Sequence, residues 1–296
     1  MRAWLSGLAA ALLVGAALGA WLTRPGTVDT SRLEGLTGDP AQGERVFWAA
    51  GCASCHAAPG AEGEALLVLS GGHAIENGFG TFVAPNISSH PSAGIGGWDR
   101  EDFARAVWAG VAPDGRHYYP AFPYTAYAGI TPQDLADLWS FMQGLPESAN
   151  RPGPTALAFP YSVRRGIGLW KRLHAGHGYV LDVPAGSELE RGRYLAEALG
   201  HCGECHTPRT ALGGLDRSRW MAGAPNPSGR GTIPGITPAT LGWSAEDIAY
   251  YLESGFTPEF DSAGGTMASV VRSYARLPAE DRAAVAAYVK ALPPIE

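Results

Sequence analysis

The stretches CASCH at residues 52–56 and CGECH at residues 202–206 decide the fold of this chain. They contain all four cysteines of the sequence, so no sulfur is left over for a disulfide. In both stretches two residues separate the cysteines, and a histidine follows directly. Such a short turn puts both sulfurs on one side, where they can bond the vinyl groups of a porphyrin while the imidazole reaches the iron. C-x-x-C-H is the attachment signature of c-type haem, and the sequence therefore predicts two covalently attached haem c groups.

Two other uses of these cysteines fit the sequence less well. A structural zinc site would need further ligands that the two halves of the chain do not jointly supply. A thioredoxin-like redox pair would need a βαβ setting, which the sequence lacks. Haem attachment uses every cysteine and makes the two motif histidines the proximal iron ligands. The residues expected to hold the cofactors are Cys52, Cys55, His56, Cys202, Cys205 and His206.

Landmarks recur in the same order after each motif, which indicates an internal duplication. The tripeptide PNI at residues 85–87 returns as PGI at residues 234–236. Each half then ends in a helix that begins at a proline and stops at Leu-Pro, over residues 132–145 and 278–292. Both predicted helices carry apolar residues at i, i+3, i+4 and i+7, which is one apolar stripe.

Length and composition agree with two compact domains. The chain has 296 residues, of which 46% are hydrophobic and 17% charged, and domains commonly hold about 100–200 residues. Because no strand alternation is visible, we expect an all-α fold in which residues 39–146 and 187–296 are two copies of one helical domain. The net charge of −6, without a dense Lys/Arg run, argues against nucleic acid as a partner.

The N-terminal segment has the length and composition of a membrane span. Residues 3–22 carry no charge and are flanked by arginines, and about 20 apolar residues cross a hydrocarbon core. We expect residues 1–24 to be an uncleaved transmembrane anchor and residues 25–38 a polar tether. A cleaved signal peptide is the main alternative, ahead of a buried soluble helix. The flanking charges are too balanced to give the orientation of the span.

Residues 147–186 read as a linker between the two domains, because they contain three prolines in their first half. They also carry a basic patch. Its members are Arg164, Arg165, Lys171 and Arg172. The simpler interpretation is a segment that straps the domains together, and the alternative is a docking surface for an acidic partner.

Three further stretches make the resemblance to a family specific. They are GGHAIENGFGTFVAPNI at residues 71–87, GIGGW at 94–98 and HYYPAFPYTAY at 117–127. With the two C-x-x-C-H motifs, they resemble the membrane-anchored dihaem and trihaem cytochrome c subunits of periplasmic alcohol and gluconate dehydrogenases. The resemblance implies two tandem class I cytochrome c domains behind an anchor. It also implies that the carbonyls of Pro85 and Pro234 accept the N–H of the proximal imidazoles, although each proline also fits a plain turn.

In class I cytochromes the sixth iron ligand is usually a methionine between the last two helices. Met267, on the glycine-rich stretch GGTM at residues 264–267, is the candidate for haem 2. Met221 follows His206 by only fifteen residues and should pass on the proximal side. His/Met ligation raises the reduction potential, which suits haem 2 to the exit of an electron path.

Haem 1 lacks this methionine. Related sequences place it where this chain has Phe122 or Ile130, and neither side chain binds iron. Met142 falls on the core stripe of the last helix of that half, so we expect it to pack. The sixth ligand of haem 1 is therefore left open among His117, His73, His90, and water or a vacant position. Three other histidines, His174, His177 and His201, are expected to be solvated or hydrogen-bonded rather than ligands.

The function that fits these features is electron transfer from a periplasmic dehydrogenase or a quinol-linked donor toward a respiratory acceptor. The sequence shows no constellation of catalytic side chains, so we expect an electron-transfer protein or a subunit of an oxidoreductase complex rather than a stand-alone enzyme. Because c-type haem is attached outside the cytoplasmic membrane, both domains should face the periplasm from an inner-membrane anchor. The alternative is a haem enzyme of the peroxidase or thiosulfate-oxidising type, acting at haem 1 if its sixth site is open.

Overall fold

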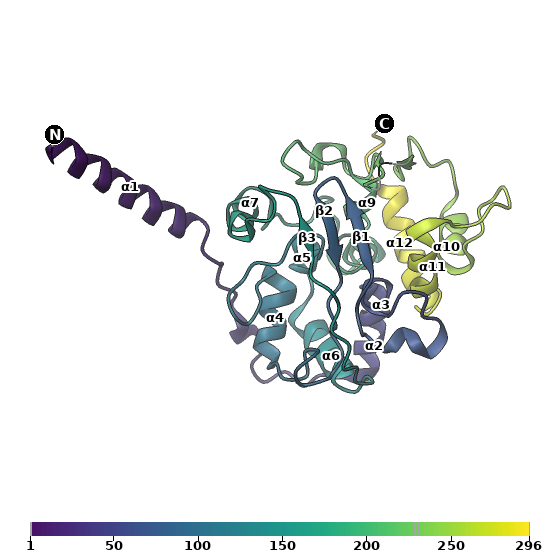
Figure 1. The fold of residues 1–296 in the computed structure, drawn as a ribbon. Coiled ribbons are helices and arrows are strands. Elements are labelled where there is room, and N and C mark those ends of the chain that lie inside the picture. Colours follow the sequence, from purple (N-terminus) through teal and green to yellow (C-terminus); the bar gives the residue numbers. More distant parts are fainter. Residues whose placement is uncertain (1, 228, 230, 296) are drawn as a thin grey trace.

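The apolar N-terminal segment forms one long helix, α1 (Arg2–Leu22), which projects away from the rest of the molecule in the computed structural model (Figure 1). The structure describes residues 2–227, 229 and 231–295. Met1 and Glu296, the outer limits of the predicted anchor and second domain, lie outside the described residues. Within α1, Trp4–Leu22 is long and apolar enough to cross a membrane, and none of its apolar window is buried in the molecule.

The first domain folds into helices whose ends match local signals in the sequence. The elements from the tether onward are η1 (Thr30–Leu33), α2 (Pro40–Ala49), α3 (Cys52–His56), η2 (Gly63–Leu67), β1 (Ala74–Asn77), β2 (Gly80–Val83), α4 (Arg100–Ala109), α5 (Tyr124–Tyr127) and α6 (Pro132–Gln143). Asp39 caps α2 by accepting the Ala41 N–H at 2.8 Å. Thr131 caps α6 in the same way, and a proline occupies the first turn of both helices. These helices start where the sequence predicts.

The second domain repeats this order with its own local features. Its elements are α8 (Glu188–Arg193), η4 (Tyr194–Leu199), α9 (Gly203–His206), η5 (Arg217–Arg219), β4 (Ala224–Pro225), β5 (Thr232–Ile233), α10 (Ala245–Ser254), α11 (Gly265–Tyr274) and α12 (Ala279–Ala291). The helix that leads to the second motif ends in a π-helical turn, η4, whereas α2 is α-helical throughout. The expectation that Met267 lies on a loop is wrong. Gly264 is extended and caps α11, so Met267 sits in the first turn of that helix.

In each domain the helix before the motif crosses the last helix at very close range. A Cβ added to Gly43 of α2 would lie 2.0 Å from the Asp137 carbonyl oxygen of α6. A Cβ added to Gly192 of α8 would lie 2.0 Å from the Ala284 carbonyl oxygen of α12. Only glycine lets the two backbones approach so closely. This shared crossing confirms that the duplication seen in the sequence is structural.

Short strands are the part of the fold that the sequence did not predict. β1 and β2 form an antiparallel hairpin, and β3 (Ala156–Leu157) pairs with β2 from the segment after domain 1. β4 and β5 form a second antiparallel pair in domain 2. Strands of two to four residues are too short to show period-two alternation. They are short antiparallel pairs within a fold that is otherwise helical.

The two domains lie side by side, and each packs a late helix on the other's motif region (Figure 1). α5 of domain 1 contacts η4, which leads to the second motif, while α11 of domain 2 contacts α2 and α3, which lead to and form the first. Arg276 places its guanidinium 4.2 Å from the centre of the Trp48 ring across this boundary. Both motifs are therefore near the domain interface.

The segments before and after domain 1 also pack against it. Arg100 of α4 donates to the carbonyls of Leu33 and Leu36, which lie in the predicted tether, at 2.9 and 2.7 Å. After α6, the buried Asn86 donates its amide to the carbonyls of Ser148 and Asn150 at 2.7 and 2.8 Å. The predicted linker then forms η3 (Arg164–Gly166) and α7 (Ile167–His174), which stand beside the end of α1 (Figure 1).

Candidate functional site

Each C-x-x-C-H stretch forms one helical turn after a left-handed residue. Gly51 has φ +65° before α3, and His201 has φ +41° before α9. Glycine adopts this conformation readily, whereas a histidine needs support from its surroundings. The His201 ring donates through Nδ1 to the Leu199 carbonyl at 2.9 Å and packs edge-on against Tyr127 at 5.4 Å. The expectation that His201 is hydrogen-bonded is confirmed.

The two motif histidines are held in the same way. His56 Nδ1 donates to the Pro85 carbonyl at 2.8 Å, and His206 Nδ1 donates to the Pro234 carbonyl at 2.8 Å. The role predicted for both prolines is thus confirmed. Because Nδ1 carries the proton, Nε2 is the nitrogen left to bind a metal, and the carbonyl fixes the ring orientation. Burial lowers the pKa of both imidazoles, which favours the neutral form that ligates iron.

Three of the four motif cysteines are partly buried, and Cys205 is exposed. Burial raises the pKa of Cys52 and Cys202 to about 12, so both are protonated at neutral pH. Burial also raises the pKa of Cys55, and a negative charge on the nearby Cys205 of the other domain raises it further. All four thiols therefore lie in surroundings that favour their protonated form.

The donor set fits haem c better than a bare metal ion. Among the residues that the structure describes, no group of three or more His, Cys, Asp or Glu side chains is placed to hold a metal ion. A structural zinc site needs four such ligands arranged tetrahedrally. Two thiols one turn apart, followed by an imidazole whose Nδ1 is fixed, match the covalent and axial attachments of haem c.

The three methionines within the described residues divide into one candidate ligand and two packing residues. Met221 is fully buried, and its backbone carbonyl accepts the Ile236 N–H at 2.9 Å, two residues after Pro234. This places it near the proximal side, as expected. Met142 is 2% exposed in the core, also as expected. Met267 is only partly buried and packs at the edge of the core.

An aromatic cluster occupies the position in domain 1 that corresponds to Met267. Backbone bridges Val111–His117 and Phe256–Ser262 set the same register in the two domains, and counting five residues beyond each bridge gives Phe122 and Met267. The Phe122 ring lies edge-on to its aromatic neighbours. These are Tyr118 at 5.9 Å, Tyr124 at 6.3 Å and Tyr127 at 5.7 Å. Domain 1 thus has rings where domain 2 has a thioether.

The histidine candidates for haem 1 each have other contacts. His117 is buried, and its Nε2 donates to the Thr23 carbonyl, just beyond α1, at 2.9 Å. The His73 carbonyl accepts the Ala84 N–H at 2.9 Å, directly before Pro85, whose own carbonyl binds His56. His90 Nδ1 accepts the Ala93 N–H at 3.1 Å within its own turn. The sequence could not reveal the His117 contact, because its partner lies 94 residues away.

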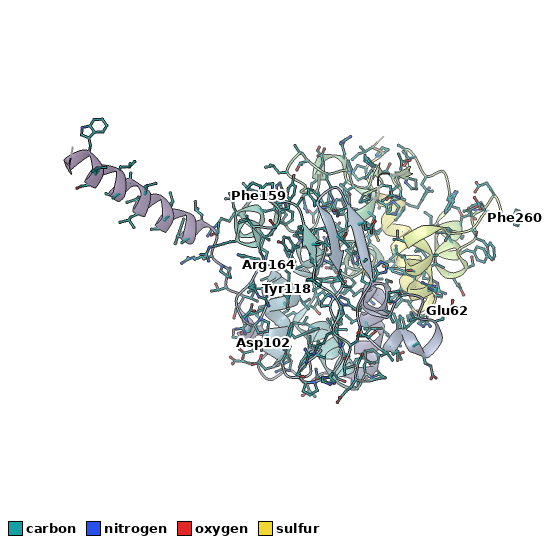
Figure 2. All side chains as sticks on the ribbon, viewed as in Figure 1. Glu62, Asp102, Tyr118, Phe159, Arg164 and Phe260 are labelled. Carbon is teal, nitrogen blue, oxygen red and sulfur yellow. The ribbon has the colours of Figure 1, made fainter. Side chains whose placement is uncertain are left out.

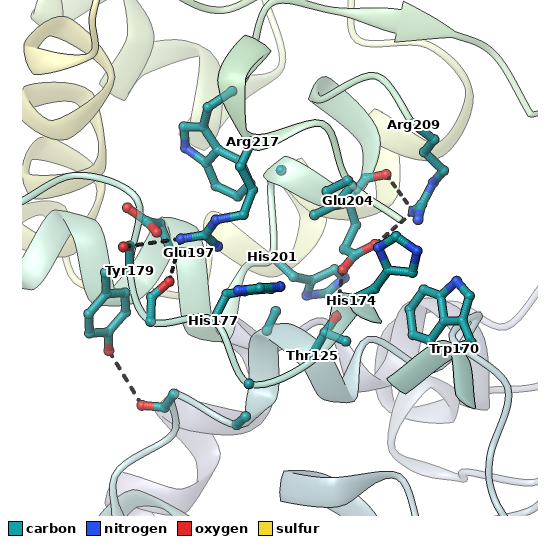
Figure 3. A pocket seen from close by; sticks show the side chains of 18 residues that line it. Thr125, Trp170, His174, His177, Tyr179, Glu197, His201, Glu204, Arg209 and Arg217 are labelled. Atoms are coloured by element: carbon teal, nitrogen blue, oxygen red, sulfur yellow. Dashed lines mark hydrogen bonds and ion pairs between the residues drawn. The ribbon is translucent and has the colours of Figure 1, made fainter. Parts of the chain in front are cut away.

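Sequence reasoning missed a cavity behind the second motif. It encloses about 340 Å³ between α5, the segment after α7 and domain 2, and His174, His177 and His201 line it (Figure 3). Glu204, inside the CGECH stretch, accepts the Thr125 hydroxyl at 3.0 Å and pairs with Arg209 at 2.7 Å. This carboxylate ties the second motif to domain 1 (Figure 3).

Two regions of the chain match a known protein family. The family model for cytochrome c matches residues 40–146 and again residues 189–293. The chain belongs to the cytochrome c family. Both matched regions contain one C-x-x-C-H motif, so this cytochrome has two haem c domains, and two haem groups are implied.

Curated relatives agree with a dihaem cytochrome. This cytochrome is 58% identical over 295 residues to a protein described as diheme cytochrome c-type from Cereibacter sphaeroides, covering 100% of this chain and 99% of that protein. It is 36% identical to the fructose dehydrogenase cytochrome subunit of Gluconobacter japonicus, over 85% of this chain and 52% of the relative. It is 31% identical to the cytochrome c subunit of a quinone alcohol dehydrogenase from Gluconobacter oxydans, over 86% and 55%.

The cytochrome thus spans nearly all of one relative and about half the length of the dehydrogenase subunits. Homology to cytochrome subunits of dehydrogenases implies electron transfer as its general role.

Proposed function

We propose that the protein is a membrane-anchored dihaem cytochrome that carries electrons from a periplasmic quinone-linked dehydrogenase, or from quinol, to a respiratory acceptor. The observation that supports it most is the pair of equal contacts, His56 to Pro85 and His206 to Pro234, each at 2.8 Å. Two axial ligands prepared in the same way in one rigid body suit two one-electron centres in series.

The residues of this chain divide the work of holding the cofactors. Cys52, Cys55 and His56 would hold haem 1, and the corresponding residues of the CGECH stretch would hold haem 2. When bound, haem c supplies a one-electron redox centre. The proline carbonyls orient the imidazoles and raise their basicity, and the buried walls limit solvent reorganisation. Met267 would complete the coordination of haem 2 and raise its potential.

The domain interface supports electron exchange between the two sites. Across it, α11 of domain 2 contacts α3, which forms the first motif, and α5 of domain 1 contacts η4, which leads to the second. Tyr127 lies between the motifs, since its hydroxyl donates to the Ala50 carbonyl at 2.6 Å and its ring contacts His201. These contacts hold the two motif regions against each other, as electron exchange between two bound haems would require.

The proposed donor and location rest on the relatives and on α1. Relatives of this chain are named as cytochrome subunits of fructose and quinone alcohol dehydrogenases. Quinones partition into membranes, so we infer a donor at the membrane, and α1 is long and apolar enough to hold this cytochrome there. We place both domains on the periplasmic side, where haem c is attached.

Reduction by a membrane dehydrogenase tests this proposal. The full-length holoprotein is reconstituted in vesicles with a quinone-linked dehydrogenase, its substrate is added, and the reduced haem absorbance is followed. We expect both haems to be reduced only when dehydrogenase and substrate are present together. Haems that dithionite reduces but that no quinol or quinone-linked dehydrogenase reduces would contradict the proposed donor.

A second function is favoured by one observation, the aromatic side chain at the position of the missing methionine. With Phe122 there, haem 1 would have an open or weakly held sixth site, as in haem enzymes that bind peroxide or thiosulfate. Binding of cyanide, peroxide or thiosulfate to oxidised haem 1, followed by turnover, would support this enzyme. Low-spin spectra for both haems, unaffected by these ligands, would exclude it.

A further inference from the structure

Large apolar side chains gather in the open beside the end of α1. Among the described residues outside α1, eleven large apolar residues are exposed to solvent. Six of these eleven lie between residues 159 and 179. Leu169 and Leu173 project from α7 one turn apart, at 46% and 52% exposure. The indole of Trp170 in α7 donates to the Leu212 carbonyl at 3.0 Å, which brings the 66%-exposed Leu212 to the same surface. Such a concentration marks an interaction surface.

We name this surface the interfacial patch and define it by its apolar members. They are Phe159, Val163, Leu169, Leu173 and Leu212. Phe159 is the most exposed of them, at 81%, and it lies on the side of the body from which α1 departs (Figure 2).

The helix that carries the patch also holds the C-terminal end of α1. Arg172 donates to the Leu22 carbonyl at 2.6 Å, and Arg165 donates to the Ala20 carbonyl at 2.9 Å. The last four carbonyls of a helix lack partners within it, and its negative dipole end favours cations. A Cβ on Gly168 would lie 2.5 Å from the Thr23 carbonyl. α7 is therefore fixed against the point where the apolar span ends.

This contact sets the depth of α7 relative to a bilayer. Ala20 and Leu22 belong to the last turn of the span and differ by about 3 Å along its axis, at 1.5 Å per residue. Headgroup layers extend roughly 5–7 Å beyond the hydrocarbon on each side. Side chains bonded to these carbonyls therefore lie at headgroup level. Trp21 stands there too, with the guanidiniums of Arg24 and Arg172 at 5.5 and 5.2 Å from its ring.

We propose that the interfacial patch rests in the phospholipid headgroup layer beside α1 and holds both cytochrome domains in one orientation on the bilayer. This inference rests on the membrane anchor of the proposed function. The chemistry of the surface matches a bilayer, since apolar side chains meet the acyl boundary while the exposed Arg165 and Arg172 meet phosphate. The linker is then a membrane-contact element.

The packing of the tether agrees with a fixed orientation. A flexible tether would let the domains swing, but Arg100 binds the Leu33 and Leu36 carbonyls, and His117 binds the Thr23 carbonyl. The route from span to domain is therefore pinned at several points. A fixed orientation keeps the same face of the cytochrome toward a membrane-bound donor.

Photo-crosslinking from lipid tests the position of the patch. The full-length holoprotein is placed in phosphatidylethanolamine and phosphatidylglycerol vesicles that contain a phospholipid with a diazirine near its headgroup, and adducts are mapped by mass spectrometry. We expect adducts on α1, on residues 159–173 and at Leu212. Phe260, 93% exposed on the far side of the body, is the internal control and should carry none (Figure 2).

The outcomes separate the patch from the anchor. Adducts on α1 but not on the patch would overturn this inference and leave the anchor standing, and would point to a protein that covers the patch instead. Adducts on the patch without α1 would contradict the anchor, and with it the placement of the patch beside a membrane-spanning α1. Adducts on neither would overturn both.

A pair of variants tests the orientation. Leu169→Glu with Leu173→Glu places charges at the boundary, and Phe260→Glu is the matched control on an equally open site. In oriented membranes we expect the double variant to lose the linear dichroism of the haem bands while its absorption spectrum stays that of the parent, and the control to keep both. Unchanged dichroism in the double variant would overturn the proposal.

Discussion

Methionine 267 is the residue that we propose as the sixth ligand of haem 2. Replacement by leucine removes the sulfur while it nearly keeps the volume. We predict that Met267→Leu lowers the potential of one haem by about 0.1 V or more, within the roughly 0.8 V that axial ligands span. The same variant should lose one low-spin signal in low-temperature electron paramagnetic resonance. The matched control is Met142→Leu, a swap inside the core that should leave both haems unchanged. An unchanged pair of signals in Met267→Leu would show that this sulfur is no ligand.

Replacing phenylalanine 122 by methionine tests haem 1 in the opposite way, because it adds a possible sulfur ligand. If register alone decides the ligand, Phe122→Met returns a thioether to the position that Met267 holds in the repeat. We predict a higher potential for haem 1 and weaker cyanide binding, both followed optically. A variant that binds haem normally and shows neither change would mean that the aromatic cluster does not face the iron.

For single residues, the sequence predicts which side chains hold the haem groups, but it does not predict contacts between residues far apart in the chain. The motif histidines could be predicted because the spacing of C-x-x-C-H fixes them, and their proline partners were implied by the resemblance to a known family. The partners of His117 and Glu204 could not be predicted, because Thr23 and Thr125 approach only through tertiary packing across many residues.

The glycine at each helix crossing should be required for the stability of the domain. Gly192→Ala places a methyl group 2.0 Å from the Ala284 carbonyl, so α8 and α12 must separate. Overpacking of this kind costs about 1–3 kcal/mol, and we expect a loss of unfolding free energy at or above that range in guanidinium titrations of the holoprotein. Gly144→Ala, whose Cβ would meet its nearest atom at 3.5 Å, is the control and should change little. Equal stability of the two variants would disprove the close crossing.

Lysine 171 should make the stability of the folded protein depend on pH. It donates to the Ala109 and Gly110 carbonyls at 2.6 and 2.7 Å, and burial lowers its pKa from 10.5 to about 8. Between these values the folded protein binds fewer protons than the unfolded chain, so this group makes stability rise with pH. The parent should therefore gain stability from pH 8 to 10 relative to Lys171→Met, as measured by denaturation at several pH values. A constant difference between the two proteins would contradict the shifted pKa.

Helices could be predicted because caps and breakers mark their ends. Asp39 with Pro40 and Thr131 with Pro132 are local signals, and the structure follows them. The strands and the helical start at Gly265 could not be predicted, since two to four residues carry no period and paired glycines read equally well as a loop.

The whole molecule is two copies of one domain that turn their motif regions toward each other. The repeat was visible in the sequence because its landmarks keep their order. The mutual packing of α5 on η4 and of α11 on α3 was not, because nothing local records which surfaces meet. That packing places both motif regions at the boundary between the two domains.

Intact mass spectrometry of the full-length protein, matured in a host that attaches haem c, tests whether the chain carries two covalently bound haems. We expect a mass that exceeds the polypeptide by two haem groups. We also expect the variant Cys202→Ala with Cys205→Ala to retain one haem, held by Cys52 and Cys55. A parent protein with the mass of the bare chain, or a variant that still carries two haems, would contradict this expectation.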